Sequence, residues 1–141
     1  MRTRIDAPNI ARDRQGAAAL EFALVGPPLA LLAFGILQYG VYFGVAHSVQ
    51  QLTNDAARVA VAGLNEAERT QLVREHVDAH WRDYGLVRED SVAVSVSDAG
   101  GAITVQSRYD ASYLPIFAMK GLVPMPPSTI EDRASVRVGG F

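Results

Sequence analysis

The sequence predicts an α+β fold, in which a long N-terminal helix crosses a membrane and then packs with a second helix on a small antiparallel sheet. Three patterns lead to this prediction. An uncharged apolar stretch extends from Phe22 to Ala46, a helical stripe continues to Ala62, and segments of two-residue alternation occupy much of the last third of the chain. The order of the strands does not follow from these patterns.

Composition limits the classes of protein that fit. With 141 residues, the chain has room for one small domain beyond a membrane anchor. A net charge of −2 gives no electrostatic reason to expect nucleic-acid binding. The absence of cysteine excludes disulfides, thiolate metal sites and a cysteine nucleophile.

The charges on either side of the apolar stretch predict its topology. Residues 1–16 hold four arginines against two aspartates, whereas the chain after Ala46 holds nine basic and twelve acidic residues. An excess of arginine beside a span keeps that side cytoplasmic. We therefore expect a cytoplasmic leader over 1–16, a transmembrane helix over 17–46 and an extracytoplasmic domain over 47–141.

A cleaved secretory signal is the competing interpretation of the same stretch. Its apolar region usually has about 7–15 residues, and the stretch here is much longer. The A-x-A pattern downstream, Ala60-Val61-Ala62, lies far beyond its end. A conventional signal peptide is therefore not expected.

Two features stand out within the predicted span. Tandem Pro27-Pro28 lies in its first third, where it frees backbone carbonyls and predicts a kink. Near its far end, Tyr39, Tyr42 and Phe43 fit an aromatic belt at the membrane interface. We expect these three rings to make ordinary lipid contact.

The helical pattern continues beyond the span. Apolar residues at spacings of four and three extend the first helix to Ala62, and Gly63 is a suitable C-cap. Asn65 followed by Glu68 resembles a capping box and predicts the start of a second helix, which Gly85 ends.

Three segments alternate as half-buried strands do. They are Ser91–Ser97, a partner over Ile103–Tyr109 and a third strand over Thr129–Val138. The turn of the first hairpin is predicted at Asp98-Ala99-Gly100-Gly101. Between the second and third strands, residues 113–127 are rich in proline and very apolar. They either cover the sheet and the long helix or form a surface that contacts a bilayer or a partner.

The sequence does not predict an enzyme. His76 and His80 have the four-residue spacing of metal ligands on a helix. The zinc-protease patterns require glutamate directly after the first histidine or directly before the second, where this chain has Val77 and Ala79. We expect a solvated helix face there, with no metal and no cofactor.

Glu21 stands at the edge of the apolar stretch, where a carboxylate is costly unless it has a role. In one interpretation it lies in the first helical turn, favoured by the helix dipole and exposed at the lipid headgroups. In the other, the chain is cut after Gly16, and the new amine pairs with Glu21 of a neighbouring helix inside an apolar bundle. Such a pair would be costly to break and would fix the axial register.

The segment RQGAAALEFALVGPPLALLAFGILQYG, followed by QQLTNDAARVA, resembles the N-terminal signature of TadE-like pseudopilins of the tight-adherence (Flp, type IVc) pilus system, within the type IV pilin superfamily. The family motif is a glycine, four residues, then glutamate and an aromatic residue. Here Gly16, Ala17 to Leu20, Glu21 and Phe22 match it. The resemblance implies a pilin-like fold and cleavage between Gly16 and Ala17 by a prepilin peptidase. It also implies that Glu21, at the fifth mature position, is needed for processing or subunit assembly.

The resemblance implies a minor pilin or pseudopilin with a structural role in pilus assembly, initiation or regulation, for surface adhesion and biofilm formation. The implied partners are other pilins through helix bundling, the prepilin peptidase, the inner-membrane assembly platform and the lipid bilayer. The protein would be a single-pass inner-membrane protein with a periplasmic C-terminal domain. Two alternatives stay open: an uncleaved single-pass scaffold or periplasmic binding module, and a membrane-anchored metal-dependent enzyme that uses His76 and His80.

Overall fold

The computed structural model describes residues 14–88 and 91–137. The chain divides into two units, residues 1–37 and 38–141. Within the described residues, the second unit contains α2, two 3-10 helices and a three-stranded antiparallel sheet after α1. The α+β class predicted from the sequence is confirmed.

Helix α1 extends over Arg14–Ala60 and passes through both units. The helix continues through Pro27 and Pro28. From Gly16 to Ala60 it is long and apolar enough to cross a membrane. The first part of the helix exposes many large apolar side chains. No core within the described residues covers them, as a core would in a soluble protein.

Helix α2 covers Glu66–His80 and begins as the sequence predicts. The Asn65 side chain accepts a hydrogen bond from the backbone N–H of Glu68 at 2.9 Å, and Glu68 accepts one from the N–H of Leu64 at 2.9 Å. These two bonds satisfy N–H groups that a helix start leaves without partners. A 3-10 helix, η2 (Trp81–Tyr84), then leads to Gly85, whose φ of 52° suits glycine.

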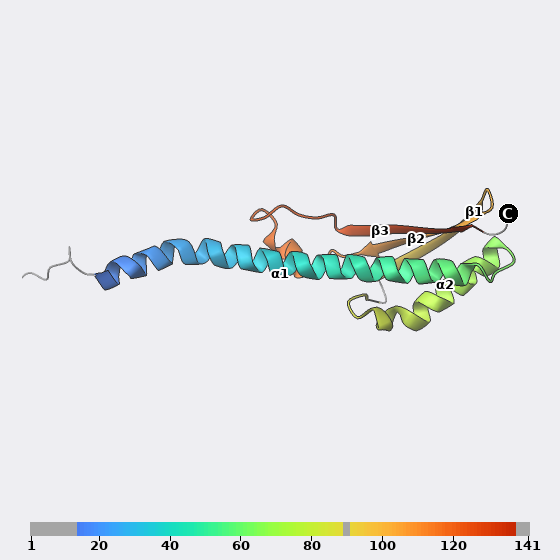
Figure 1. The fold of residues 1–141 in the computed structure, drawn as a ribbon, viewed down its shortest axis with the longest axis horizontal. Helices are drawn as coiled ribbons and strands as arrows, with labels where there is room; N and C mark the ends of the chain where they lie inside the picture. The colour runs from blue at the N-terminus through green and yellow to red at the C-terminus, as the bar shows by residue number, and fades with distance from the viewer. Residues whose placement is uncertain (1–13, 89–90, 138–141) are drawn as a thin grey trace, which may run out of the picture. The chain divides into compact units, whose positions relative to one another are not determined.

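The sheet has the order β1-β2-β3, with β1 over Val92–Ala99, β2 over Ala102–Asp110 and β3 over Thr129–Arg137 (Figure 1). The predicted four-residue turn between β1 and β2 is wrong, because Asp98 and Ala99 pair with Ile103 and Ala102. The turn is made by Gly100 and Gly101 alone, with φ of 61° and 74°. Two positive φ angles match a two-residue hairpin turn that follows the twist of the strands.

One face of the sheet joins the helices of the second unit in a single hydrophobic core. Alternate residues of β2 are buried, and β3 buries Ile130 and Ala134, so each strand has one inward and one outward face. The helical contribution comes from the stripe of α1 and from α2. The fully buried side chains include Val45, Val49, Leu52, Val73, Ile103, Val105, Tyr109 and Ile116.

Arg69 ties the start of α2 to the sheet. Its side chain is 9% exposed, donates from Nε to the carbonyl of Gly63 at 3.0 Å, and forms an ion pair with Asp98 of β1. Gly63 leaves no room for a side chain, since an added Cβ would lie 2.6 Å from Arg69 Cγ and 2.8 Å from its backbone nitrogen. The turn between α1 and α2 therefore depends on both residues.

The segment between β2 and β3 covers part of the core, as one of the two alternatives predicted. Leu114 and Ile116 are buried, and a 3-10 helix, η4, occupies Pro115–Met119. Leu122, in contrast, is 67% exposed. The segment therefore has a buried part that covers the core and a turn that exposes an apolar side chain.

Two tyrosines of α1 hold the end of this segment. Tyr39 donates its hydroxyl hydrogen to the carbonyl of Pro124 at 2.5 Å, and Tyr42 donates to the carbonyl of Pro127 at 3.0 Å. The prediction of lipid contact is wrong for Tyr42, which is 7% exposed. The reason is a partner 85 residues away in the chain. Phe43 is 62% exposed, so its ring is free for lipid or another apolar surface.

Candidate functional site

The predicted processing and assembly residues all lie near the start of α1. Gly16, Ala17, Glu21 and Phe22 are helical, and their side chains or Cα atoms are exposed. Ala17 and Glu21 are four residues apart and so lie on one face of the helix. Within the described residues, Glu21 makes no side-chain hydrogen bond or ion pair.

The surroundings of Glu21 are apolar. Leu20 is 73% exposed, and Phe22 and Leu24 are each 77% exposed. The ring of Phe22 lies beside Gly26, four residues further along the helix, where an added Cβ would meet ring atoms at 3.6 Å. A single carboxylate thus stands within an otherwise apolar, exposed helix surface. That surface can contact lipid or other helices, and the carboxylate would require a cationic partner there.

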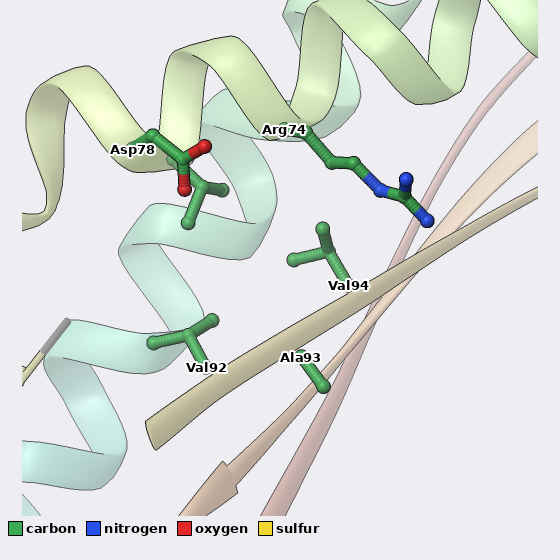
Figure 2. A pocket seen from close by; sticks show the side chains of 6 residues that line it. Arg74, Asp78, Val92, Ala93 and Val94 are labelled. Carbon is green, nitrogen blue, oxygen red and sulfur yellow. The ribbon is translucent and has the colours of Figure 1, made fainter. Parts of the chain in front are cut away.

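A groove in the second unit lies between α2 and the edge strand β1 (Figure 2). Arg74 and Asp78 line it from α2, and Val92, Ala93 and Val94 line it from β1. The view shows Val92 and Val94 directed toward the helix and the Arg74 guanidinium extended along the groove. Its lining holds one cation, one anion and an apolar floor, without a hydroxyl, imidazole or thiol nucleophile. The groove has the chemistry of a packing or contact surface and lacks the groups for covalent catalysis.

His76 and His80 form a stacked pair with ring centroids 4.4 Å apart. His80 is exposed, as expected for a solvated helix face, but Nε2 of His76 is buried without a hydrogen-bond partner. The prediction of a solvated face is therefore wrong for His76. Burial lowers the pKa of His76, neighbouring His80 lowers it further, and the charge of Asp55 opposes both.

A hydrogen bond between Tyr84 and Asp55 links η2 to α1. The hydroxyl of Tyr84 donates to Asp55 at 2.7 Å. Burial, followed by the hydrogen bond and the charge of Asp55 and by Asp83, raises the pKa of Tyr84 to about 12. Among the described residues, no group of three or more histidine, cysteine, aspartate or glutamate side chains could hold a metal ion.

Comparison with known proteins finds similarity to a protein family in the N-terminal part of the chain. Residues 16–58 match the family model described as TadE-like protein. The resemblance to TadE-like pseudopilins is confirmed over these residues. The match begins at Gly16, the glycine of the predicted processing motif. No curated protein matches the chain, and no solved structure does so.

Proteins of the TadE-like family are structural and accessory pilus proteins that are not known as enzymes, so the match over residues 16–58 suggests a protein associated with a tight-adherence pilus. The apolar N-terminal helix suggests that the protein is anchored in a membrane. The match also suggests association with other pilus components in general. The matched residues include Glu21 and the part of α1 that enters the core of the second unit.

Sequence reasoning did not find the tyrosine contacts, the Arg69 bridge or the groove beside β1. All three join residues that are distant in the chain, and none has a local pattern. A weak signal was present only for Arg69, a charged residue within the predicted α2 that lies one residue after the capping glutamate.

Proposed function

We propose that this protein is a minor pilin or pseudopilin of a tight-adherence pilus, which is cut between Gly16 and Ala17 and then acts structurally in pilus assembly, initiation or regulation. The observation that supports this best is the TadE-like match from residue 16 onward, together with an exposed glutamate five positions into the cleaved chain. Surface adhesion and biofilm formation would be the cellular result of that assembly.

Cleavage would change the electrostatics at the start of α1. The helix would begin at Ala17 with an ammonium group, and Glu21 would lie just over one turn away. In a bundle of such helices, the ammonium of one subunit can pair with Glu21 of its neighbour, because no group within the described residues already occupies this carboxylate. In an apolar bundle that pair would fix the relative height of the subunits.

The membrane span in this proposal extends over residues 17–37, shorter than the predicted 17–46. From Gln38 onward the helix belongs to the second unit, and Tyr42 and Val45 are buried in its core. The remaining segment of about 21 residues rises roughly 31 Å as a helix, close to the roughly 30 Å of a hydrocarbon core. Residues 1–16 would be cytoplasmic and the second unit periplasmic, with the inner membrane between them.

The proposed partners follow from these surfaces. The exposed apolar face of residues 17–37 would contact lipid before assembly and the helices of other pilins after it. The prepilin peptidase would read Gly16, Glu21 and Phe22, and the inner-membrane assembly platform would receive the processed subunit.

Intact mass of the membrane-extracted protein tests the proposal. The chain is co-expressed with its cognate peptidase, whose activity is verified on a pilin substrate, as wild type, Glu21→Gln and Glu66→Gln. Glu66 is an exposed glutamate at the start of α2 and provides the matched control. We expect a mature chain that begins at Ala17 in the wild type and in the control. Glu21→Gln should lose either processing or, when processed, crosslinking to other pilus subunits. Uncleaved wild-type protein beside an active peptidase would contradict the proposal and leave the uncleaved single-pass scaffold or binding module.

A further inference from the structure

We propose that the turn around Leu122 is a membrane-surface contact, which inserts into the lipid headgroup layer at the periplasmic end of the proposed span over residues 17–37. This inference rests on the proposed membrane span and adds a second point of lipid contact, in a different part of the chain. It concerns residues 119–123, which lie far along the chain from the predicted span.

The position of this turn relative to α1 is fixed from both sides. Upstream, Ile116 of η4 is fully buried in the core. Downstream, Tyr39 donates its hydroxyl hydrogen to the carbonyl of Pro124. Between them, the backbone N–H of Leu122 donates to the carbonyl of Met119 at 3.0 Å, and Gly121 has φ of 91°. A tight turn therefore holds Leu122 within two residues of the point attached to Tyr39.

Chain connectivity places that point at the end of the span. Leu37 and Gln38 are consecutive, so an inserted segment that ends at Leu37 must end about 3 Å of helix rise before Tyr39. Headgroup regions add roughly 5–8 Å on each side of the hydrocarbon core. Tyr39 therefore lies at headgroup level, and its hydrogen bond to Pro124 keeps the neighbouring turn within reach of this layer.

The chemistry of the surface matches lipid. Leu122 is 67% exposed and Phe43 is 62% exposed. Residues 22–46 carry no charge, and between Ala111 and Ser128 the one charged residue is Lys120, which is exposed. An apolar side chain beside a single lysine, with no carboxylate in either stretch, suits a layer of anionic phosphate above hydrocarbon.

The absence of cysteine allows the contact to be measured at single positions. Leu122→Cys, Leu64→Cys and Leu29→Cys are each labelled with an environment-sensitive fluorophore in the full chain. The proteins are reconstituted in vesicles of phosphatidylcholine and phosphatidylglycerol that contain lipids with a nitroxide at a shallow or a deep position. Leu64 is 87% exposed and serves as the matched water-facing control, whereas Leu29 reports on the span itself.

We expect the label at 122 to shift to shorter wavelength and to be quenched most by the shallow nitroxide. The label at 29 should be quenched most by the deep nitroxide, and the label at 64 should remain unquenched. Tyr39→Phe removes the hydroxyl that holds Pro124, so it should reduce quenching at 122 and leave quenching at 29 unchanged. Lys120→Glu should reduce quenching at 122 more in vesicles with phosphatidylglycerol than in vesicles without it.

The outcomes separate this inference from the proposed function. Deep quenching at 29 with a label at 122 that behaves like the one at 64 would overturn the inference and leave the span intact. A label at 122 that is shielded from water but not quenched by lipid would show that a protein surface covers the turn, which also overturns it. No quenching at 29 would overturn both the span and the contact that depends on it.

Discussion

Replacement of Arg69 by methionine should destabilise the second unit strongly. Methionine keeps the length and the apolar stem of arginine but removes the guanidinium. The bond from Nε of Arg69 to the Gly63 carbonyl is buried, and a hydrogen bond from a charged donor contributes about 1.5–3 kcal/mol. The ion pair with Asp98 adds less than ~1 kcal/mol, because the Asp98 side chain is 38% exposed and water screens it. We therefore expect the free energy of unfolding to fall by about 2–4 kcal/mol.

Urea unfolding of the full chain in detergent, followed by circular dichroism, measures this loss. Arg74→Met is the matched control, because Arg74 lies on the same helix, is exposed and lines the groove beside β1. It should change the free energy of unfolding by less than about 0.5 kcal/mol. Asp98→Asn should cost less than Arg69→Met in the wild type and nothing further in the Arg69→Met background. Equal losses for Arg69→Met and Arg74→Met would refute the bridge between the α1–α2 turn and the sheet.

Two further predictions concern the same unit. Gly63→Ala should lower the free energy of unfolding by about 1–3 kcal/mol in the same urea measurement, because the new Cβ would meet the backbone of Arg69. Gly40→Ala is the control: nothing lies within 4 Å of its Cβ position, so the change should be neutral or slightly stabilising. A neutral Gly63→Ala would contradict the close approach. Folding lowers the pKa of His76, so the folded state favours its neutral form. The stability that depends on this neutral form is present above pH 6.5 and is lost as the pH falls below 6.5 toward the folded-state pKa. Thermal unfolding at pH 7.5 and 5.5 should show a loss at the lower pH that His76→Gln reduces, and an unchanged loss in that variant would assign the effect to other groups.

The start of α1 could be predicted because its signals are local. A long uncharged stretch, an arginine-rich leader and the spacing from Gly16 to Glu21 are all readable within a few residues of one another. The same holds for the capping pair Asn65 and Glu68 and for the alternating strands, whose side chains mark their own inner face. Local propensity and period specify these elements before any tertiary contact forms.

The hairpin turn shows the limit of that local information. The sequence Asp98 to Gly101 contains three residues that favour turns, one aspartate and two glycines, and a four-residue turn fits it. Strand pairing decides otherwise, since β1 gains two more pairs with β2 when the glycines alone form the turn. Asp98 then reaches Arg69 of α2, a contact that no pattern along the chain specifies.

The sequence by itself determined the α+β class, the apolar N-terminal helix and the TadE-like motif with its glutamate. The tertiary structure decided where the apolar stretch ends as free surface and where it enters the folded unit. The hydroxyls of Tyr39 and Tyr42 donate to carbonyls 85 residues away in the chain. Val45 is buried in a core to which several segments contribute. Hydropathy records only that a residue is apolar, and lipid and protein core bury apolar side chains equally well. Packing between distant segments is what separates the two.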